Sequence, residues 1–453
     1  MAKRMETGVD RISSLPDNVR EEILMLLPLR DAAKASLLST KWRNLWANIP
    51  CLVFDRSFCP MVRVCQHQDA AIGKLMLNLC TVLFLHRGPL REFSLSLPLL
   101  RSFPDHIERI LVFLQEKQID GLTITLESQY RFPCFPSYKI ECYQLPRRVF
   151  SSFSRLKTLR LCCCEIKTSP VSFDGFRMLT VLELRNVIFS DGYSSTPWSF
   201  KCPLLSALTL DDCGGLFEEP DIVIEAPKLS NFRFVGKFSS LHLKHTPLLK
   251  TAILNKQFPP TEHKKDGPSK VLQIWGGLAA VESLSVSGHF YQYLARGNQA
   301  IDLSPLEMVT HMTLDELWFS GRICMWSALY MIMKAPNLQR LTISTKKKLK
   351  QMSDTSTSAA LGPSSELDNG RFRDMIVRAF GYRMGQLKRV EVKRVDGAKP
   401  EMNYIRWLLN SSPVLAKMEI QLSPELSAAE KMLILTALNG FERISAKARI
   451  IIT

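Results

Sequence analysis

The residues most able to perform chemistry in this chain are its twelve cysteines and one pair of closely spaced histidines. Three cysteines are consecutive, from Cys162 to Cys164, and His242 and His245 lie three residues apart. Structural zinc sites normally draw on C-x-x-C pairs, and the sequence contains no such pair. We therefore predict no metal ligands and no cofactor, and we expect the two histidines to be exposed side chains.

The sequence also lacks the motifs of common enzyme classes. It contains no nucleotide-binding G-x-x-x-x-G-K-[ST] or G-x-G-x-x-G, no hydrolase G-x-S-x-G and no metalloprotease H-E-x-x-H. We therefore predict that the chain has no catalytic residues and works by binding other molecules.

Composition and charge restrict the class of protein further. The chain has 453 residues, which gives room for two or three domains or for one elongated array. Its hydrophobic fraction of 46% is that of a folded protein. Its first residues are charged, and its longest apolar segment, Leu75 to Leu85, is far shorter than the roughly 18 residues of a membrane span. We expect no membrane partner, reduced cysteines, and a location in the cytoplasm, the nucleus or both.

The net charge of +16 suggests nucleic acid as a partner, but the basic residues are scattered among acidic ones. The one dense basic run is Lys346 to Lys350. We interpret this run as a solvated loop, with a nuclear import signal as the alternative. Nucleic acid is accordingly not the favoured partner.

The stretch from Ile12 to Trp46 is predicted to form three short helices. In the first helix, Val19, Ile23 and Leu27 recur at a helical spacing and form one apolar stripe. Pro28 ends that helix, because proline cannot continue the pattern of backbone hydrogen bonds.

The second helix of this stretch is predicted to open at Asp31. The third is predicted to be capped by Ser39 or Thr40, which places Trp42 and Trp46 on one face. Three short helices cannot hide so many large apolar side chains, so part of this surface is expected to bind a partner.

This stretch resembles an F-box, the module that attaches a substrate receptor to the Skp-type adaptor of a cullin-RING ubiquitin ligase. The residues that carry the resemblance are Leu15, Pro16, Asp17, Ile23, Leu24, Leu27, Pro28, Leu37, Ser39, Trp42, Arg43, Leu45 and Trp46. The resemblance implies that the adaptor, and through it a cullin, are partners. The residues expected to bind the adaptor are Leu15, Pro16, Ile23, Leu24, Leu27, Pro28, Leu29, Leu37, Trp42, Leu45 and Trp46.

A six-residue pattern, apolar-x-x-apolar-x-apolar, recurs twelve times between Leu90 and Ile420. Copies such as LKTLRL from Leu156, LTVLEL from Leu179 and LSALTL from Leu205 follow one another at steps of 23 and 26 residues. Later steps are longer and irregular. Recurrence of one pattern at steps of this length indicates a repeat architecture.

This periodicity resembles leucine-rich repeats. The resemblance implies an α/β fold, in which an irregular solenoid of repeats builds a curved parallel sheet. The fourth and sixth positions of each copy are expected to point into the core, and the third and fifth to the concave face. Cys164 and Cys213 lie where such repeats carry Asn or Cys, so we expect them in repeat turns and not in a metal site.

All but one of the fifth positions are polar, they are of mixed charge, and there are no aromatic rings among them. A platform for single-stranded nucleic acid would carry stacking rings there, so a protein target is the better prediction. The candidate target-binding residues are Arg160, Glu183, Thr209, Arg233, Ser285, Thr313 and Thr342.

The C-terminal part resembles the FBD domain that follows leucine-rich repeats in many plant F-box proteins. The matching pieces are residues 387–390, 404–409, 412–415 and 446–448. The predicted domains are the F-box (residues 8–50), a helical connector (51–89), leucine-rich repeats (90–345), a flexible insertion rich in Ser, Thr and Lys (346–370), and the FBD domain with terminal repeats (371–453).

Together these resemblances point to a plant F-box, leucine-rich-repeat and FBD protein. They imply a non-catalytic, substrate-recognition subunit of an SCF-type ubiquitin ligase, which binds the adaptor through the F-box and a target protein through the repeats. The alternative is a leucine-rich-repeat scaffold or RNA-associated protein that acts independently of ubiquitin. Co-purification with a Skp-type adaptor separates the two.

Overall fold

The fold is seen in a computed structural model of the chain, which describes a large part of the sequence. The described residues are 10–55, 57–58, 68–98, 104–127, 143–145, 153–166, 177–189, 198–214, 220–257, 268–297, 303–319, 322–346 and 381–453. They form two compact units. The first contains Met1–Ser195, Cys202–Leu205 and Cys213–Phe217, and the second contains Thr196–Lys201, Ser206–Asp212 and Glu218–Thr453.

The first unit begins with helices α1 (Asp17–Met25) and α2 (Leu29–Ala35), close to the first two predicted helices. Pro16 and Pro28 stand immediately before them, and each carbonyl oxygen accepts hydrogen bonds from the first helical turn. The second helix therefore starts at Leu29, two residues before the predicted Asp31. Proline suits this place because its fixed φ is compatible with a helix start and its missing N–H is not needed there.

The prediction of a third α-helix is wrong. Residues 40–44 make turns, followed only by a short 3-10 helix, η1 (Leu45–Asn48). Asn44 has a φ of 64°, a left-handed conformation that asparagine tolerates and that interrupts a right-handed helix. Ser39 caps no helix; its hydroxyl lies 3.0 Å from that of Ser13 instead.

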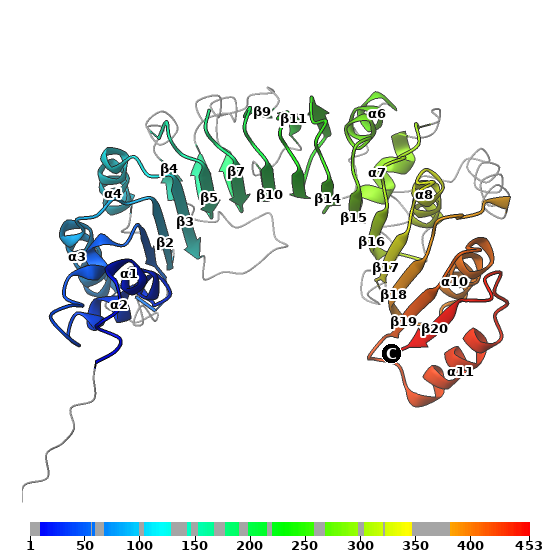
Figure 1. Ribbon diagram of the computed structural model, residues 1–453. Helices are drawn as coiled ribbons and strands as arrows, with labels where there is room; N and C mark the ends of the chain where they lie inside the picture. The colour runs from blue at the N-terminus through cyan, green and yellow to red at the C-terminus, as the bar shows by residue number, and fades with distance from the viewer. Residues whose placement is uncertain are drawn as a thin grey trace, which may run out of the picture. The chain divides into compact units, whose positions relative to one another are not determined.

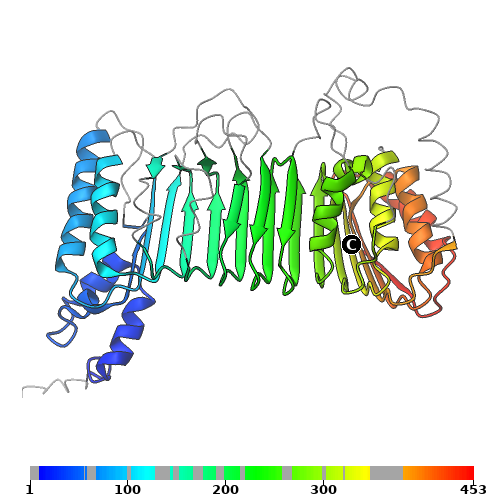
Figure 2. The ribbon, with the colours of Figure 1, turned by 90° about the horizontal axis from the view of Figure 1, so that it is seen from above.

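Strand β1 (Cys51–Phe54) follows, where the sequence predicted only a helical connector. It pairs in parallel with β2 (Glu92–Pro98), so the first strand of the repeat sheet lies directly after the N-terminal module. Helix α3 (Gln68–Leu85) is the predicted connecting helix. In the first unit it lies beside α4 (Pro104–Lys117) on one face of the sheet (Figures 1 and 2).

The main sheet of the first unit is parallel. Its strands follow the order β1, β2, β3 (Gly121–Glu127), β5 (Thr158–Cys162) and β7 (Val181–Arg185). A second, short parallel sheet contains β4 (Tyr143–Leu145), β6 (Cys164–Ile166) and β8 (Ile188–Phe189). The sequence does not indicate this second ladder, because its strands are only two or three residues long and show no full alternation.

The second unit repeats this plan. Its main parallel sheet contains β10 (Ala207–Cys213), β12 (Asn231–Gly236), β14 (Thr251–Lys256), β15 (Ser283–Gly288), β16 (His311–Leu317), β17 (Arg340–Thr345), β18 (Arg389–Val395), β19 (Lys417–Leu422) and β20 (Arg449–Ile452). A short second sheet joins β9 (Trp198–Lys201), β11 (Asp221–Glu225) and β13 (Ser240–Lys244).

Helices replace the second ladder further along this unit. They are α6 (Pro268–Gly277), α7 (Phe290–Gly297), α8 (Arg322–Met333) and α10 (Lys399–Ser411), which line one face of its main sheet (Figure 2). α6 packs closely on β13: a Cβ added at Gly277 would lie 2.4 Å from Cβ of Leu243. Glycine is therefore required where this helix meets the last short strand.

The cores follow the predicted alternation. All twelve copies of the repeat bury their first, fourth and sixth positions, as in Leu156, Leu159 and Leu161 of one copy and Leu338, Leu341 and Ile343 of another. Third and fifth positions are exposed or half-buried, except the third-position glycine Gly121, which is buried. The α/β fold with parallel sheets built by the repeats is confirmed within each unit.

The C-terminal elements follow the apolar spacing of the sequence. This spacing predicts helices at 402–409 and 428–438 and strands at 415–420 and around 446–450, and the structure has α10, α11 (Ala428–Asn439), β19 and β20 there. Ser427 and Glu430 form a capping box at the start of α11. Apart from Lys346, the predicted insertion at 346–370 lies outside the described residues, as do residues 372–380, where the same spacing predicts a helix.

Candidate functional site

The N-terminal module is held together by polar contacts around Trp42. The Trp42 Nε1–H donates to the Ser13 hydroxyl over 3.0 Å. Arg20 is buried beside this pair, with its guanidinium 5.9 Å from the centre of the Trp42 ring. It donates through Nε to the Leu15 carbonyl over 3.0 Å and through Nη1 to the Lys41 carbonyl, and it pairs with Asp17. These bonds join α1 to the segment before η1.

Arg20 and Ser13 were not among the predicted site residues. Arg20 lies beside the apolar stripe of α1, one residue after Val19, where sequence reasoning expects a solvated charge. The available signal was the residue type, because a guanidinium is weakly hydrated and can stack on an aromatic ring, which partly offsets the cost of burying it.

The predicted adaptor-binding residues divide into three groups by exposure. Leu24, Leu29 and Trp42 are buried, so they build the module's own core, contrary to the expectation that they face a partner. Leu15, Ile23, Leu45 and Trp46 are half-buried, and Pro16, Leu27, Pro28 and Leu37 are exposed. The exposed group is the part available for binding in this conformation.

The ends of α1 and α2 carry the largest exposed apolar side chains of the module. Leu26 and Leu37 are 86% exposed, and Leu38 is 75% exposed. Met25 and Leu27 are more than 40% exposed beside them in sequence. We name Met25, Leu26, Leu27, Leu37 and Leu38 the leucine surface. Exposed apolar groups concentrated in one small module indicate a binding surface.

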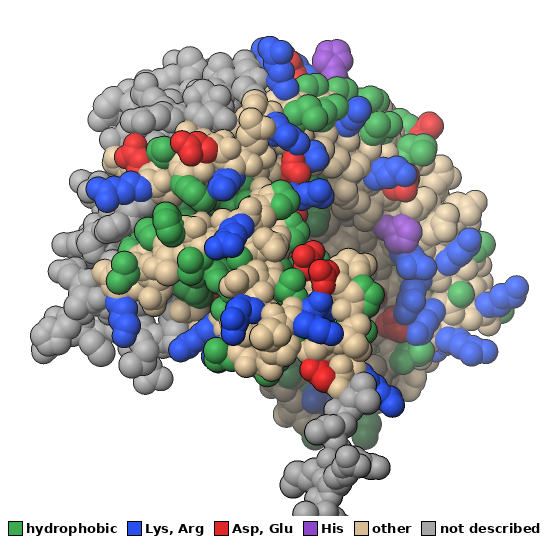
Figure 3. Space-filling model, turned by 60° about the vertical axis from the view of Figure 1, so that its left-hand side comes forward, with side chains coloured by type: hydrophobic (Ala, Val, Ile, Leu, Met, Phe, Trp, Pro, Cys, Tyr) green, Lys and Arg blue, Asp and Glu red, His purple; other side chains and the backbone are tan. Residues whose placement is uncertain are grey.

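The first unit also exposes apolar side chains beyond the leucine surface. Leu77 is 67% and Phe84 is 87% exposed on α3. Figure 3 shows hydrophobic side chains lying among Lys and Arg side chains on the face turned to the viewer.

The second candidate surface is formed by the fifth positions of the repeats. In the first unit the strand register aligns Ser94, Thr123, Arg160 and Glu183 as cross-strand neighbours. The Arg160 Nε donates to Glu183 Oε2 over 3.1 Å, and Glu183 also pairs with Arg185. The structure therefore brings together the two predicted residues Arg160 and Glu183, already paired with each other.

In the second unit, Arg233 begins a line of fifth positions. The register aligns it successively with Ile253, Ser285, Thr313, Thr342, Glu391 and Glu419. Arg233 is paired with Asp211 over 3.0 Å. Thr209 lies on β10 and is half-buried. The predicted residues of this unit thus lie on one face, and most are hydroxyl side chains.

Two cysteine thiols of the first unit lie close to backbone carbonyl oxygens. The Cys164 thiol lies 3.5 Å from the Cys162 carbonyl oxygen, and the Cys213 thiol lies 3.3 Å from the Leu184 carbonyl oxygen. The hydrogen bond to Cys163, together with burial, raises the pKa of the Cys162 thiol. Burial likewise raises the pKa of Cys324 to about 11. Thiols held protonated in this way are poor nucleophiles and poor metal ligands.

His242 and His245 do not come together in a metal site. His242 is half-buried on β13, whereas His245 is exposed just beyond it with a φ of 51°. Burial lowers the pKa of His242. Within the described ranges, no group of three or more His, Cys, Asp or Glu side chains is arranged to hold a metal ion. Over the same ranges, no helix combines the length and the apolar character of a membrane span.

Comparison with known proteins identifies the N-terminal module. Residues 12–54 match the F-box domain model. An F-box/FBD/LRR-repeat protein of Arabidopsis thaliana is 28% identical over 99% of this chain and 99% of its own length. A second such Arabidopsis protein is 32% identical over 46% of this chain and 40% of its own length.

A solved leucine-rich-repeat protein of Legionella pneumophila has 12% identity and covers 81% of this chain and 95% of its own. Its TM-score of 0.28 is too low to inform the fold, which rests on the strand pairing and burial described above.

Proposed function

Because the chain belongs to the plant F-box, leucine-rich-repeat and FBD protein family, we propose that it is a substrate-recognition subunit of an SCF-type ubiquitin ligase. In this role the F-box binds a Skp-type adaptor, and through it a cullin, while the repeats bind a target protein. The chain itself catalyses no reaction. It holds the target near a ubiquitin-charged enzyme, so that the rate gain comes from proximity.

The observation that carries this proposal is the leucine surface. Leu26, Leu37 and Leu38 are largely exposed to water in a module whose own core is already filled by Leu24, Leu29 and Trp42. Covering one leucine side chain at an interface contributes about 1.5–3 kcal/mol. Leucines left outside a completed core are therefore best explained by a partner protein that covers them.

The proposal is tested by the double variant Leu37→Ser with Leu38→Ser. We expect it to lose about 100-fold or more in affinity for a Skp-type adaptor, because about 3 kcal/mol of apolar contact is removed. Folding should survive, since both side chains are exposed already. The assay is titration of the purified adaptor by calorimetry.

The matched control is Leu248→Ser, which removes a leucine of 54% exposure from the second unit. It should leave adaptor affinity unchanged. Wild-type protein that binds no adaptor would contradict the proposal and favour a scaffold that acts without ubiquitin. We further propose that the chain acts in the cytoplasm, the nucleus or both, and the nuclear fraction of a variant lacking residues 346–350 tests import by that basic run.

A further inference from the structure

Basic side chains occupy equivalent positions, at the first residue, of four consecutive strands in the second unit. They are Arg340 on β17, Arg389 on β18, Lys417 on β19 and Arg449 on β20. The strand register pairs Arg340 with Arg389, Arg389 with Lys417, and Lys417 with Arg449. We name these four residues the basic row. Third positions share a face with the fifth positions, because side chains two residues apart point the same way.

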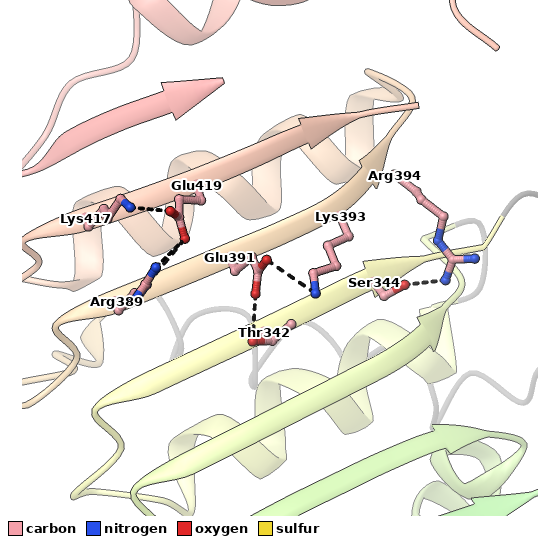
Figure 4. A network of polar contacts seen from close by, with 8 residues as sticks. All are labelled: Thr342, Ser344, Arg389, Glu391, Lys393, Arg394, Lys417 and Glu419. Atoms are coloured by element: carbon pink, nitrogen blue, oxygen red, sulfur yellow. Dashed lines mark hydrogen bonds and ion pairs between the residues drawn. The ribbon is translucent and has the colours of Figure 1, made fainter. Parts of the chain in front are cut away.

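The carboxylates next to this row are already engaged. The Arg389 Nη2 lies 2.9 Å from Glu419 Oε2, and Lys417 pairs with the same carboxylate (Figure 4). The hydrogen bond from Lys417, followed by that from Arg389, lowers the pKa of Glu419, so this carboxyl group stays ionised at neutral pH. Glu391 is paired with Lys393 over 3.3 Å.

The two ends of the basic row are exposed arginines. Arg340 and Arg449 make no side-chain hydrogen bond or ion pair with another residue in the described part of the chain. Guanidinium groups bind carboxylates through two parallel hydrogen bonds, and exposed arginines are available for this geometry. The row therefore offers two open sites for carboxylate groups, one on either side of a centre whose positive charge is partly neutralised.

The spacing of these sites fits an extended peptide. Neighbouring strands lie about 4.8 Å apart, so three strand spacings separate Arg340 from Arg449 by about 14 Å. An extended peptide advances about 3.4 Å per residue, and residues i and i+4 are then about 14 Å apart on the same side. Residue i+2 lies between them, above Arg389 and Lys417.

We infer that the basic row binds an acidic protein segment in extended conformation, whose carboxylates at positions i and i+4 reach Arg340 and Arg449. Nucleic acid fits the face less well. The fifth positions beside the row are Thr342, Glu391, Glu419 and Ile451, which offer no ring for a base to stack on. That the bound segment belongs to the ligase target rests on the function proposed above.

The test uses the full chain and a fluorescent peptide with glutamate at alternate positions over seven residues. We expect saturable binding, with an affinity about tenfold weaker for the double variant Arg340→Gln with Arg449→Gln, because two exposed charge pairs are lost. A peptide with glutamine in place of each glutamate should bind at least tenfold more weakly. Melting curves of the variant should match wild type, since both side chains are exposed.

The matched control is Arg87→Gln with Arg91→Gln, two exposed arginines of the first unit. It removes the same charge and should leave peptide affinity unchanged. An equal loss in both double variants would show general attraction to a basic protein and overturn the inference. So would tighter binding of a single-stranded oligonucleotide through Arg340 and Arg449.

Adaptor binding, measured on the same variants, keeps the two proposals separate. We expect Arg340→Gln with Arg449→Gln to bind the adaptor as wild type does. If the wild-type chain binds no adaptor, the proposed ligase role is refuted and the peptide result still stands. If it binds the adaptor normally but binds no peptide, only the inference about the basic row is refuted.

Discussion

Replacing Glu401 with glutamine should raise the free energy of unfolding at neutral and alkaline pH and flatten its dependence on pH. Glu401 lies in the first turn of α10 and is only 2% exposed. Its Oε2 accepts hydrogen bonds from the backbone N–H groups of Asp396 at 2.9 Å and Gly397 at 2.8 Å. Burial nevertheless outweighs these bonds and raises the pKa of the carboxyl group to about 7.

The magnitude follows from that pKa. A carboxyl group whose pKa rises from 4.5 to about 7 on folding costs the folded state about 3 kcal/mol once it is ionised. Below pH 4.5 the group is protonated in both states and costs nothing. Between pH 4.5 and 7 the folded state holds the proton more tightly, so stability falls as pH rises, and the full cost is present above pH 7.

The assay is chemical denaturation of wild type and Glu401→Gln at pH 5 and pH 8. Glutamine keeps an oxygen that can accept from Asp396 and Gly397, and it carries no charge. We expect the variant to gain about 3 kcal/mol over wild type at pH 8 and far less at pH 5. Glu442→Gln, an exposed glutamate of the same unit, is the control. An equal difference at both pH values would refute the reasoning.

Two further predictions concern the same unit. Gly397→Ala should destabilise the chain by about 1–3 kcal/mol, because Gly397 has a φ of 79° and an added Cβ would lie 2.6 Å from Cγ1 of Ile434. Chemical denaturation measures this loss, with Gly385→Ala as the control because a Cβ there meets open space. Deletion of residues 352–368 should leave the melting temperature within a degree or two of wild type, because loop length changes the closure entropy only slowly. A loss of several degrees would show that this segment is structured.

The repeat sheets were predictable because their signal is redundant. Each copy places three apolar side chains at fixed spacing, and all three are buried in every copy. The register then aligns fifth positions such as Thr313 and Thr342 as neighbours, as the pattern required. Side-chain alternation is a property of the strand itself, so it can be read without knowing what surrounds the strand.

Features that depend on tertiary contacts were not predictable. Strand β1 has only four residues and becomes a strand by pairing with β2. Leu24 and Trp42 carry the same apolar character as Leu37, yet only Leu37 is exposed. Which apolar residue faces inward depends on how the helices cross, and no local spacing specifies that choice. The left-handed Asn44 likewise becomes apparent only in the folded turn.

The alternation of the repeat strands also has a consequence for how recognition can change. In each strand the residues that hold the unit together and the residues that we propose to meet a partner occupy separate faces, as Leu341 and Ile343 do beside Arg340 and Thr342. Exchanges at exposed positions usually alter stability by no more than about 0.5 kcal/mol. A new binding preference can therefore arise on this scaffold one strand at a time, without any compensating change in its interior.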